Sequence, residues 1–291
     1  MGVTILDGGL GQELVARSSA EPTPLWSTRV MLDEPALVRE VHDAYFAAGA
    51  EIATANTYAV HHDRLQQAGI DERFEELHRT ACRMACEARD AHGSGRVAGA
   101  LGPIGWSYRP DLAPPAAAAA TAYAEIAAIQ AAHVDLFICE TMASVDQARG
   151  ALLGLQGAGR PVWLAISTME EDGTRLRSGE PVKDVFGVID TFKPEAVLVN
   201  CTAPEVITDS LRVLRDHGVT LGAYGNGFTR IAEDYKTSTA TVSQLQARQD
   251  MTPARYADIA EEWVALGATL IGGCCEIGPA HIAELKARFA V

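Results

Sequence analysis

Three cysteines at the ends of two apolar segments are the residues best suited to chemistry in this chain. Cys201 ends the segment EAVLVNC, and Cys274 and Cys275 end the segment TLIGGCC. Two adjacent thiols could form a disulfide, could be incidental, or could bind a metal. If both segments are strands of one closed parallel sheet, their ends lie at the same rim and the three thiols can converge. Three thiolates in a reducing compartment are a zinc-binding set with a fourth position left open, as in catalytic sites.

Polar and aromatic residues end several other apolar segments. Asp7 ends the first segment, Glu140 lies in VDLFICETM, and Asn226 lies at the end of the seventh segment, TLGAYGNG. The two carboxylates could be helix caps or surface groups, but at the mouth of a barrel they favour ligand binding. The rings of Trp26, Trp106 and Tyr108 fit either packing under a lid or recognition of a cation.

The charge of such a metal site limits the reactions that it suits. Three thiolates and one Zn²⁺ sum to a single negative charge, so the metal activates water poorly. It can still hold an incoming thiol as a thiolate, which is nucleophilic at neutral pH. That nucleophile suits a soft, cationic carbon, such as a methyl group on a sulfonium or quaternary ammonium. The residues therefore favour alkyl transfer to a thiol over hydrolysis.

Eight short apolar segments alternate with helical periodicity along the chain and would position these residues. The apolar runs are mostly continuous, which is typical of parallel strands covered on both faces. An open doubly wound sheet and a closed barrel both fit this alternation, but no Gly-x-Gly-x-x-Gly turn follows the first strand. Eight units in 291 residues predict an α/β fold, a (β/α)₈ TIM barrel spanning residues 1–291 as a single domain. The predicted strands are 3–9, 51–58, 96–103, 134–142, 161–168, 195–201, 220–227 and 269–275.

Two connections, residues 10–34 and 228–251, are long for a compact domain. Loops of this length are usually functional lids or disordered segments. Both follow predicted strands, so both are expected at the rim that carries the cysteines.

Composition limits the binding partners and the cellular compartment that are expected for this chain. The 24 basic and 38 acidic residues give a net charge of −14, which disfavours nucleic acid and anionic membranes. The start of the chain lacks the basic region of a secretory signal, and six cysteines are too few for a disulfide scaffold. A cytoplasmic location is expected. Cys82, Cys86 and Cys139 are expected to pack as apolar residues, and the pair His61–His62 is expected to be solvated.

Motifs along nearly the whole chain resemble the homocysteine S-methyltransferase family. They are DGGLGQEL, LWSTRVMLDEP, IATANTY, LGPIG, ICETMAS, VNCTAPE and GGCCEIGPAHI, in the family order. The resemblance implies a (β/α)₈ barrel, zinc on Cys201, Cys274 and Cys275, and homocysteine bound through Asp7 and Glu140. The chain departs from the family pattern at Gln12, where threonine is common, and in AYGNGF, where many members have Tyr-Pro-Asn.

The combined prediction is a zinc-dependent enzyme that transfers a methyl group from a sulfonium donor to homocysteine, giving methionine. LWSTRV resembles the branch that uses S-methylmethionine, and the substrate-binding residues are predicted to be Asp7, Glu140, Trp26 and Asn226. The alternatives are another thiol or selenol as acceptor, and betaine as donor. A lyase or aldolase-type barrel would place a lysine at a strand end, whereas the lysines fall in loops or helices: Lys183, Lys193, Lys236 and Lys286. A zinc-binding protein without catalysis would not need carboxylates at the same rim.

Overall fold

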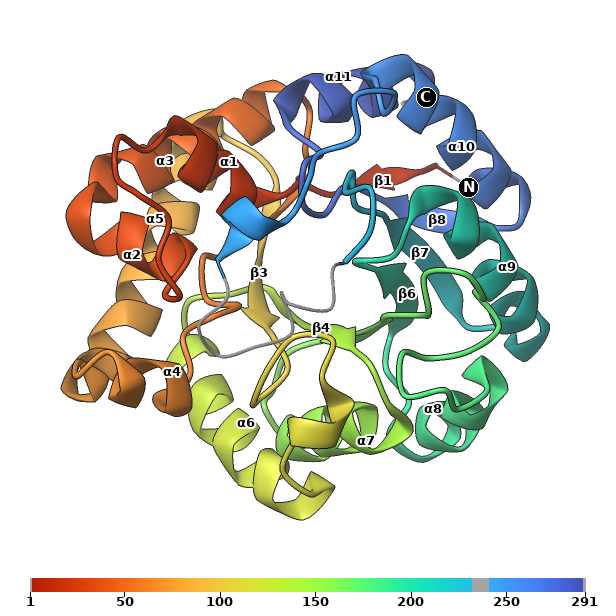
Figure 1. Cartoon of the computed structure of the whole chain (residues 1–291), viewed down its shortest axis with the longest axis horizontal. Helices are drawn as coiled ribbons and strands as arrows, with labels where there is room; N and C mark the ends of the chain where they lie inside the picture. The colour runs from red at the N-terminus through yellow and green to blue at the C-terminus, as the bar shows by residue number, and fades with distance from the viewer. Residues whose placement is uncertain (1, 232–240, 290–291) are drawn as a thin grey trace.

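Eight parallel strands form a closed barrel in the computed structural model, which describes residues 2–231 and 241–289. Each strand pairs with its neighbour in the order β1-β8-β7-β6-β5-β4-β3-β2, and a bridge from Leu6 to Ile52 joins β1 to β2. Figure 1 looks down this barrel, with the strands in the centre and the helices outside. The strands are β1 Thr4–Ile5, β2 Ile52–Thr54, β3 Arg96–Leu101, β4 Leu136–Met142, β5 Val162–Ile166, β6 Ala196–Asn200, β7 Thr220–Tyr224 and β8 Ala268–Ile271.

The helices form a ring around the barrel, so the predicted (β/α)₈ fold is confirmed. None of those within the described residues has both the length and the apolar composition that a bilayer-spanning helix requires. They are α1 Leu10–Arg17, α2 Ser27–Asp33, α3 Pro35–Ala47, α4 His62–Gln67, α5 Phe74–His92, α6 Ala116–Gln130, α7 Val145–Gly154, α8 Phe186–Phe192, α9 Pro204–Leu214, α10 Pro253–Ala265 and α11 Pro279–Phe289.

Side chains alternate between the barrel interior and the helix layer, and this alternation points the site residues inward. Along β4, Leu136 and Ile138 pack inside the barrel, whereas Phe137 and Cys139 pack against the helices. The next inward position is Glu140. The pairing of β4 with β5 shifts register just beyond it, so the regular ladder ends where the carboxylate enters the site.

The first long connection is not a loop, which corrects the prediction for residues 10–34. It contains α1 and α2, because Leu10 and Leu14 lie one helical turn apart and both pack into the core. Glu13 and Arg17 add an ion pair across one turn of α1, with 2.6 Å between the charged atoms.

The second long connection is only partly within the described residues. The prediction of a lid or a disordered segment there falls largely on residues 232–240, which lie outside the described residues. The part that follows begins with a short 3₁₀ turn, Val242–Gln244, which the Thr241 and Gln244 side chains cap.

Candidate metal and substrate site

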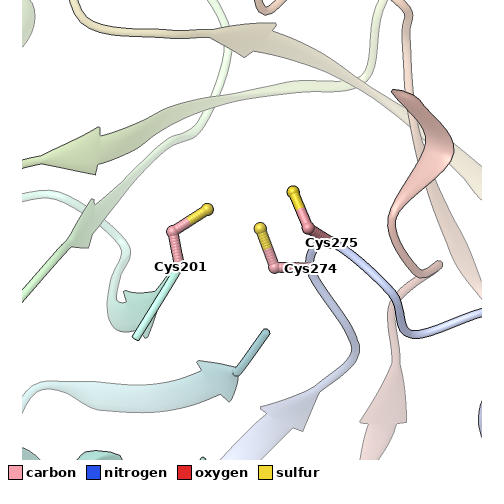
Figure 2. A group of neighbouring side chains, drawn as sticks. All are labelled: Cys201, Cys274 and Cys275. Atoms are coloured by element: carbon pink, nitrogen blue, oxygen red, sulfur yellow. The ribbon is translucent and has the colours of Figure 1, made fainter. Parts of the chain in front are cut away.

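The three predicted cysteines meet at the carboxyl ends of the strands. Cys201 directly follows β6, and Cys274 and Cys275 follow β8 after two glycines. Their sulfur atoms all lie within 4.8 Å of one another. Figure 2 shows the sulfurs of Cys274 and Cys275 side by side, facing the sulfur of Cys201. This all-sulfur donor set fits a soft divalent metal such as zinc.

Close backbone contacts explain the glycines that flank the cysteines. A Cβ atom on Gly272 would lie 2.6 Å from Cβ of Leu6, and one on Gly9 would overlap the carbonyl oxygen of Cys274. The amide of Gly273 also donates to the carbonyl oxygen of Asp7 at 2.9 Å. The segments DGG and GGCC therefore interlock, which fixes the adjacent cysteines relative to the end of β1.

An unusual backbone conformation turns Cys201 toward the other thiols. Asn200 occupies an inward position of β6, so simple alternation would point Cys201 into the helix layer. Cys201 instead has a φ of 48°, in the left-handed region that non-glycine residues seldom adopt. Both Asn200 and Cys201 consequently line the same cavity.

The side chain of Arg177 stabilises the strained backbone at Cys201. Nη2 of Arg177 donates to the carbonyl oxygen of Cys201 at 2.8 Å, and Nε donates to Oγ of Ser167 at 2.8 Å. The guanidinium also pairs with Glu170 at 2.7 Å and lies 4.4 Å from the ring centre of Tyr108. These contacts tie the end of β6 to β5 and supply the kind of surrounding structure that strained residues require.

Hydrogen bonds among the thiols leave one of them ready to ionise. The thiols of Cys274 and Cys275 donate toward Cys201 and, with Thr141 and Tyr108, hold its pKa well below that of a free cysteine. The same hydrogen bond raises the pKa of Cys274, because its proton is retained to stabilise the Cys201 thiolate. These contacts therefore favour ionisation of Cys201 over ionisation of Cys274.

Two carboxylates line the same cavity. Backbone and hydroxyl groups of Thr54 donate to Oδ2 of Asp7 at 2.7 and 3.0 Å, and the Tyr224 hydroxyl donates to Oε1 of Glu140 at 2.9 Å. Burial nevertheless raises the pKa of Asp7 to about 7 and that of Glu140 to about 8. A cation bound between them would stabilise their ionised forms, so this part of the cavity suits an ammonium group.

Aromatic side chains complete the cavity wall. Trp26 precedes α2 and packs edge-to-face with Tyr58, with 5.9 Å between the ring centres. The cavity includes space that is open to solvent. Its aromatic lining, suited to contact with a cation, consists of Trp26, Tyr58, Trp106, Tyr108, Tyr224 and Phe228.

Sequence comparison adds a match over almost the whole chain. The sequence model for homocysteine S-methyltransferase matches residues 4–289. The chain belongs to the homocysteine S-methyltransferase family. It is accordingly an enzyme of the class that transfers methyl groups to homocysteine, with homocysteine and a methyl donor as its substrates.

Individual members of the homocysteine S-methyltransferase family are similar along their full length. Homocysteine S-methyltransferase from Escherichia coli strain K12 is 33% identical, covering 98% of this chain and 95% of that protein. A selenocysteine Se-methyltransferase from Brassica oleracea var. italica is 25% identical, covering 99% and 89%. The crystal structure of the metallated homocysteine methyltransferase MmuM from Escherichia coli superposes with a TM-score of 0.82 at 28% identity, covering 99% of this chain and 96% of that one. The metallated relative and the cysteine cluster together indicate a metal site.

The first departure from the family pattern has a structural role. Nε2 of Gln12 donates to the Glu276 carboxylate at 2.7 Å, and its Oε1 accepts a hydrogen bond from the Trp26 indole at 3.0 Å. Gln12 thus connects a wall of the cavity to the residue that follows Cys275.

Asn226, in the second departure, lies beside the cavity and not on its wall. Its Oδ1 accepts the amide hydrogen of Phe228 at 3.2 Å, which stabilises the turn after β7. Its Nδ2 is buried without a hydrogen-bond partner in the described part of the chain. The role of Asn226 in substrate binding stays a prediction, whereas Tyr224 of the same segment contacts Glu140 directly.

The histidines and the described lysines do not line the cavity. His61 is buried, which corrects the prediction that the pair is solvated, and burial lowers its pKa to about 3. His62 pairs with Asp71 at 2.6 Å. None of the described lysines lines the cavity, where the aldolase-type alternative would need a Schiff-base residue; Lys236 lies outside the described residues.

Proposed function

We propose that this enzyme transfers a methyl group from S-methylmethionine to homocysteine, with zinc held by Cys201, Cys274 and Cys275. The observation that carries the proposal is the convergence of three thiols on a cavity that also holds two buried carboxylates. Bound zinc would supply a Lewis acid that keeps the homocysteine sulfur as a thiolate at neutral pH.

The chain's own residues would bind and orient the substrates. Asp7 and Glu140 accept hydrogen bonds from the homocysteine ammonium, and the ring of Trp26 bounds the space for its carbon chain. The thiolate attacks a donor methyl carbon while the bond from that carbon to the sulfonium sulfur breaks. The anion and the cation become two neutral thioethers, both of which are methionine. Fixing the two reactants in line contributes up to roughly 7–11 kcal/mol in favourable cases.

A cationic donor is supported by the cavity wall. Aromatic faces and buried carboxylates attract a sulfonium, and the net charge of −14 attracts cations at longer range. A donor screen tests the proposal: homocysteine is supplied with S-methylmethionine, betaine or S-adenosylmethionine, and methionine is measured. We expect S-methylmethionine to give the highest specificity constant. Faster transfer from betaine would show that the donor is wrong.

The purified, reduced protein is expected to contain about one zinc per chain, because one three-thiolate cluster is present in the described residues. Elemental analysis combined with thiol counting measures this ratio. Full methyl transfer by metal-free protein would overturn the zinc mechanism.

Oxidation is expected to remove zinc and activity together. Adjacent thiols that lose their metal can form a disulfide or higher oxidised species, which cannot act as thiolate ligands. The Escherichia coli relative has also been crystallised in an oxidised form, which superposes with a TM-score of 0.81. Peroxide-treated protein should be inactive and zinc-poor, and reductant plus zinc should restore both properties. Zinc that stays bound after both thiols are oxidised would contradict this expectation.

A further inference from the structure

Arg64 is a buried cation on the wall of the substrate cavity. It lies in α4, three residues after His61, and its residue exposure is only 8%. Its side chain lines the main cavity and also a second, outer hollow that Leu25, Leu32 and Ile70 help to form. Arg64 therefore stands where the buried site meets the outer surface.

No carboxylate among the described residues neutralises Arg64. Its guanidinium stacks on Trp106, 4.5 Å from the ring centre, and its Nε is buried without a hydrogen-bond partner. Two arginines that are partly buried differ, since Arg177 pairs with Glu170 and Arg248 pairs with Glu205. A buried charge without a counter-ion is costly, so Arg64 is poised to bind an anion that enters the cavity.

The charges along the cavity show which anion this would be. Arg64 is the single lysine or arginine among the described residues that line it, and Asp7 and Glu140 make another part strongly acidic. An amino acid carries an ammonium and a carboxylate. The acidic part suits the ammonium but repels the carboxylate, which therefore needs a cationic partner. The N–H groups of a guanidinium lie in its own plane as a fork that matches a carboxylate, and the Trp106 ring covers one face of the Arg64 guanidinium.

We propose that Arg64 binds the α-carboxylate of the methyl donor, an inference that rests on the proposed function. Homocysteine occupies the inner position, with its sulfur at the cysteines and its ammonium at Asp7 and Glu140. The donor enters afterwards, from the side where Arg64 and Trp106 border the outer hollow. Arg64 then discriminates amino-acid sulfonium donors from sulfonium compounds that lack a carboxylate.

Arg64→Met tests this assignment with two matched donors. One is S-methylmethionine, and the other is (3-aminopropyl)dimethylsulfonium, which differs by lacking the carboxylate. The substitution should lower the specificity constant for S-methylmethionine by about 10- to 100-fold, the effect of one charge-assisted contact. Transfer from the carboxylate-free donor should change less than about 3-fold. Arg64→Lys keeps the positive charge but loses the planar guanidinium, so its specificity constant for S-methylmethionine should lie between those of wild type and Arg64→Met.

Controls separate this role from structural damage and from the acceptor. Arg29→Met removes another guanidinium of the outer hollow, already paired with Asp33 at 2.6 Å, and should leave both donors unaffected. As acceptors, homocysteine and 3-aminopropanethiol, which lacks the carboxylate, should show the same fold-change in methyl transfer on Arg64→Met. Equal losses with both donors, or a loss confined to homocysteine, would overturn the assignment. Failure of wild-type enzyme to use S-methylmethionine would instead refute the proposed donor itself.

Discussion

Cys201→Ser is expected to abolish metal binding and methyl transfer together. A serine hydroxyl ionises poorly at neutral pH, whereas the Cys201 thiol has a pKa held low by its neighbours, Cys274 first among them. The substitution leaves two thiols and a weak oxygen donor, which zinc binds much less well than three thiolates. We expect zinc affinity to fall by at least about 100-fold, more than the loss of an outer hydrogen bond causes. Methyl transfer should fall to the background rate.

Chelator competition measures zinc affinity independently of activity. Cys86→Ser is a matched control, because Cys86 lies on the barrel exterior and donates to the carbonyl of His133 at 3.0 Å, a bond that serine can replace. The control should keep its zinc and its rate. Cys201→Ser protein that retains zinc at wild-type affinity would show that Cys201 is not a ligand.

The barrel was predictable because its signals are local. Continuous apolar runs such as PVWLAIST can be buried on both faces only as inner strands, and each alternates with helical periodicity. The rim position of Asp7, Glu140 and the cysteines followed, since parallel strands place all their carboxyl ends together. α1 and α2 were missed, because the glycines in DGGLG and the prolines in PTP suggest a loop.

Other features of the site depend on tertiary contacts. The left-handed conformation of Cys201 cannot be predicted from the motif VNCT alone. The Arg177 contacts that support it come from another part of the chain, the connection between β5 and α8. Arg64 looks like an ordinary surface residue in HHDRLQQ, a polar segment whose helix, α4, is too short to show a period. Only the folded chain shows that Arg64 is buried and that no carboxylate of the described residues faces it.

Glu140→Gln is expected to impair homocysteine specifically and to leave the metal in place. The amide keeps the shape of the side chain, and its oxygen can still accept the hydrogen bond that the Tyr224 hydroxyl now donates to Glu140. The change removes one negative charge next to the proposed ammonium position. A charge-assisted hydrogen bond there is worth roughly 1.5–3 kcal/mol, so the specificity constant for homocysteine should fall by about one to two orders of magnitude.

Comparison of two acceptors isolates that charge. 4-Mercaptobutyrate keeps the thiol, the carbon chain and the carboxylate of homocysteine but lacks the amino group, so its rate should barely respond to Glu140→Gln. The same thiol should fail completely with Cys201→Ser, which removes the metal that both acceptors need. Glu51→Gln is the matched carboxylate-to-amide control, because Glu51 pairs with Lys286 at the opposite end of the barrel. It should leave zinc binding and methyl transfer to both acceptors unchanged. Loss of zinc from Glu140→Gln would place Glu140 in the metal site. Equal losses of activity with both acceptors would make its role structural, because a contact with an ammonium group cannot affect a substrate that has no ammonium group.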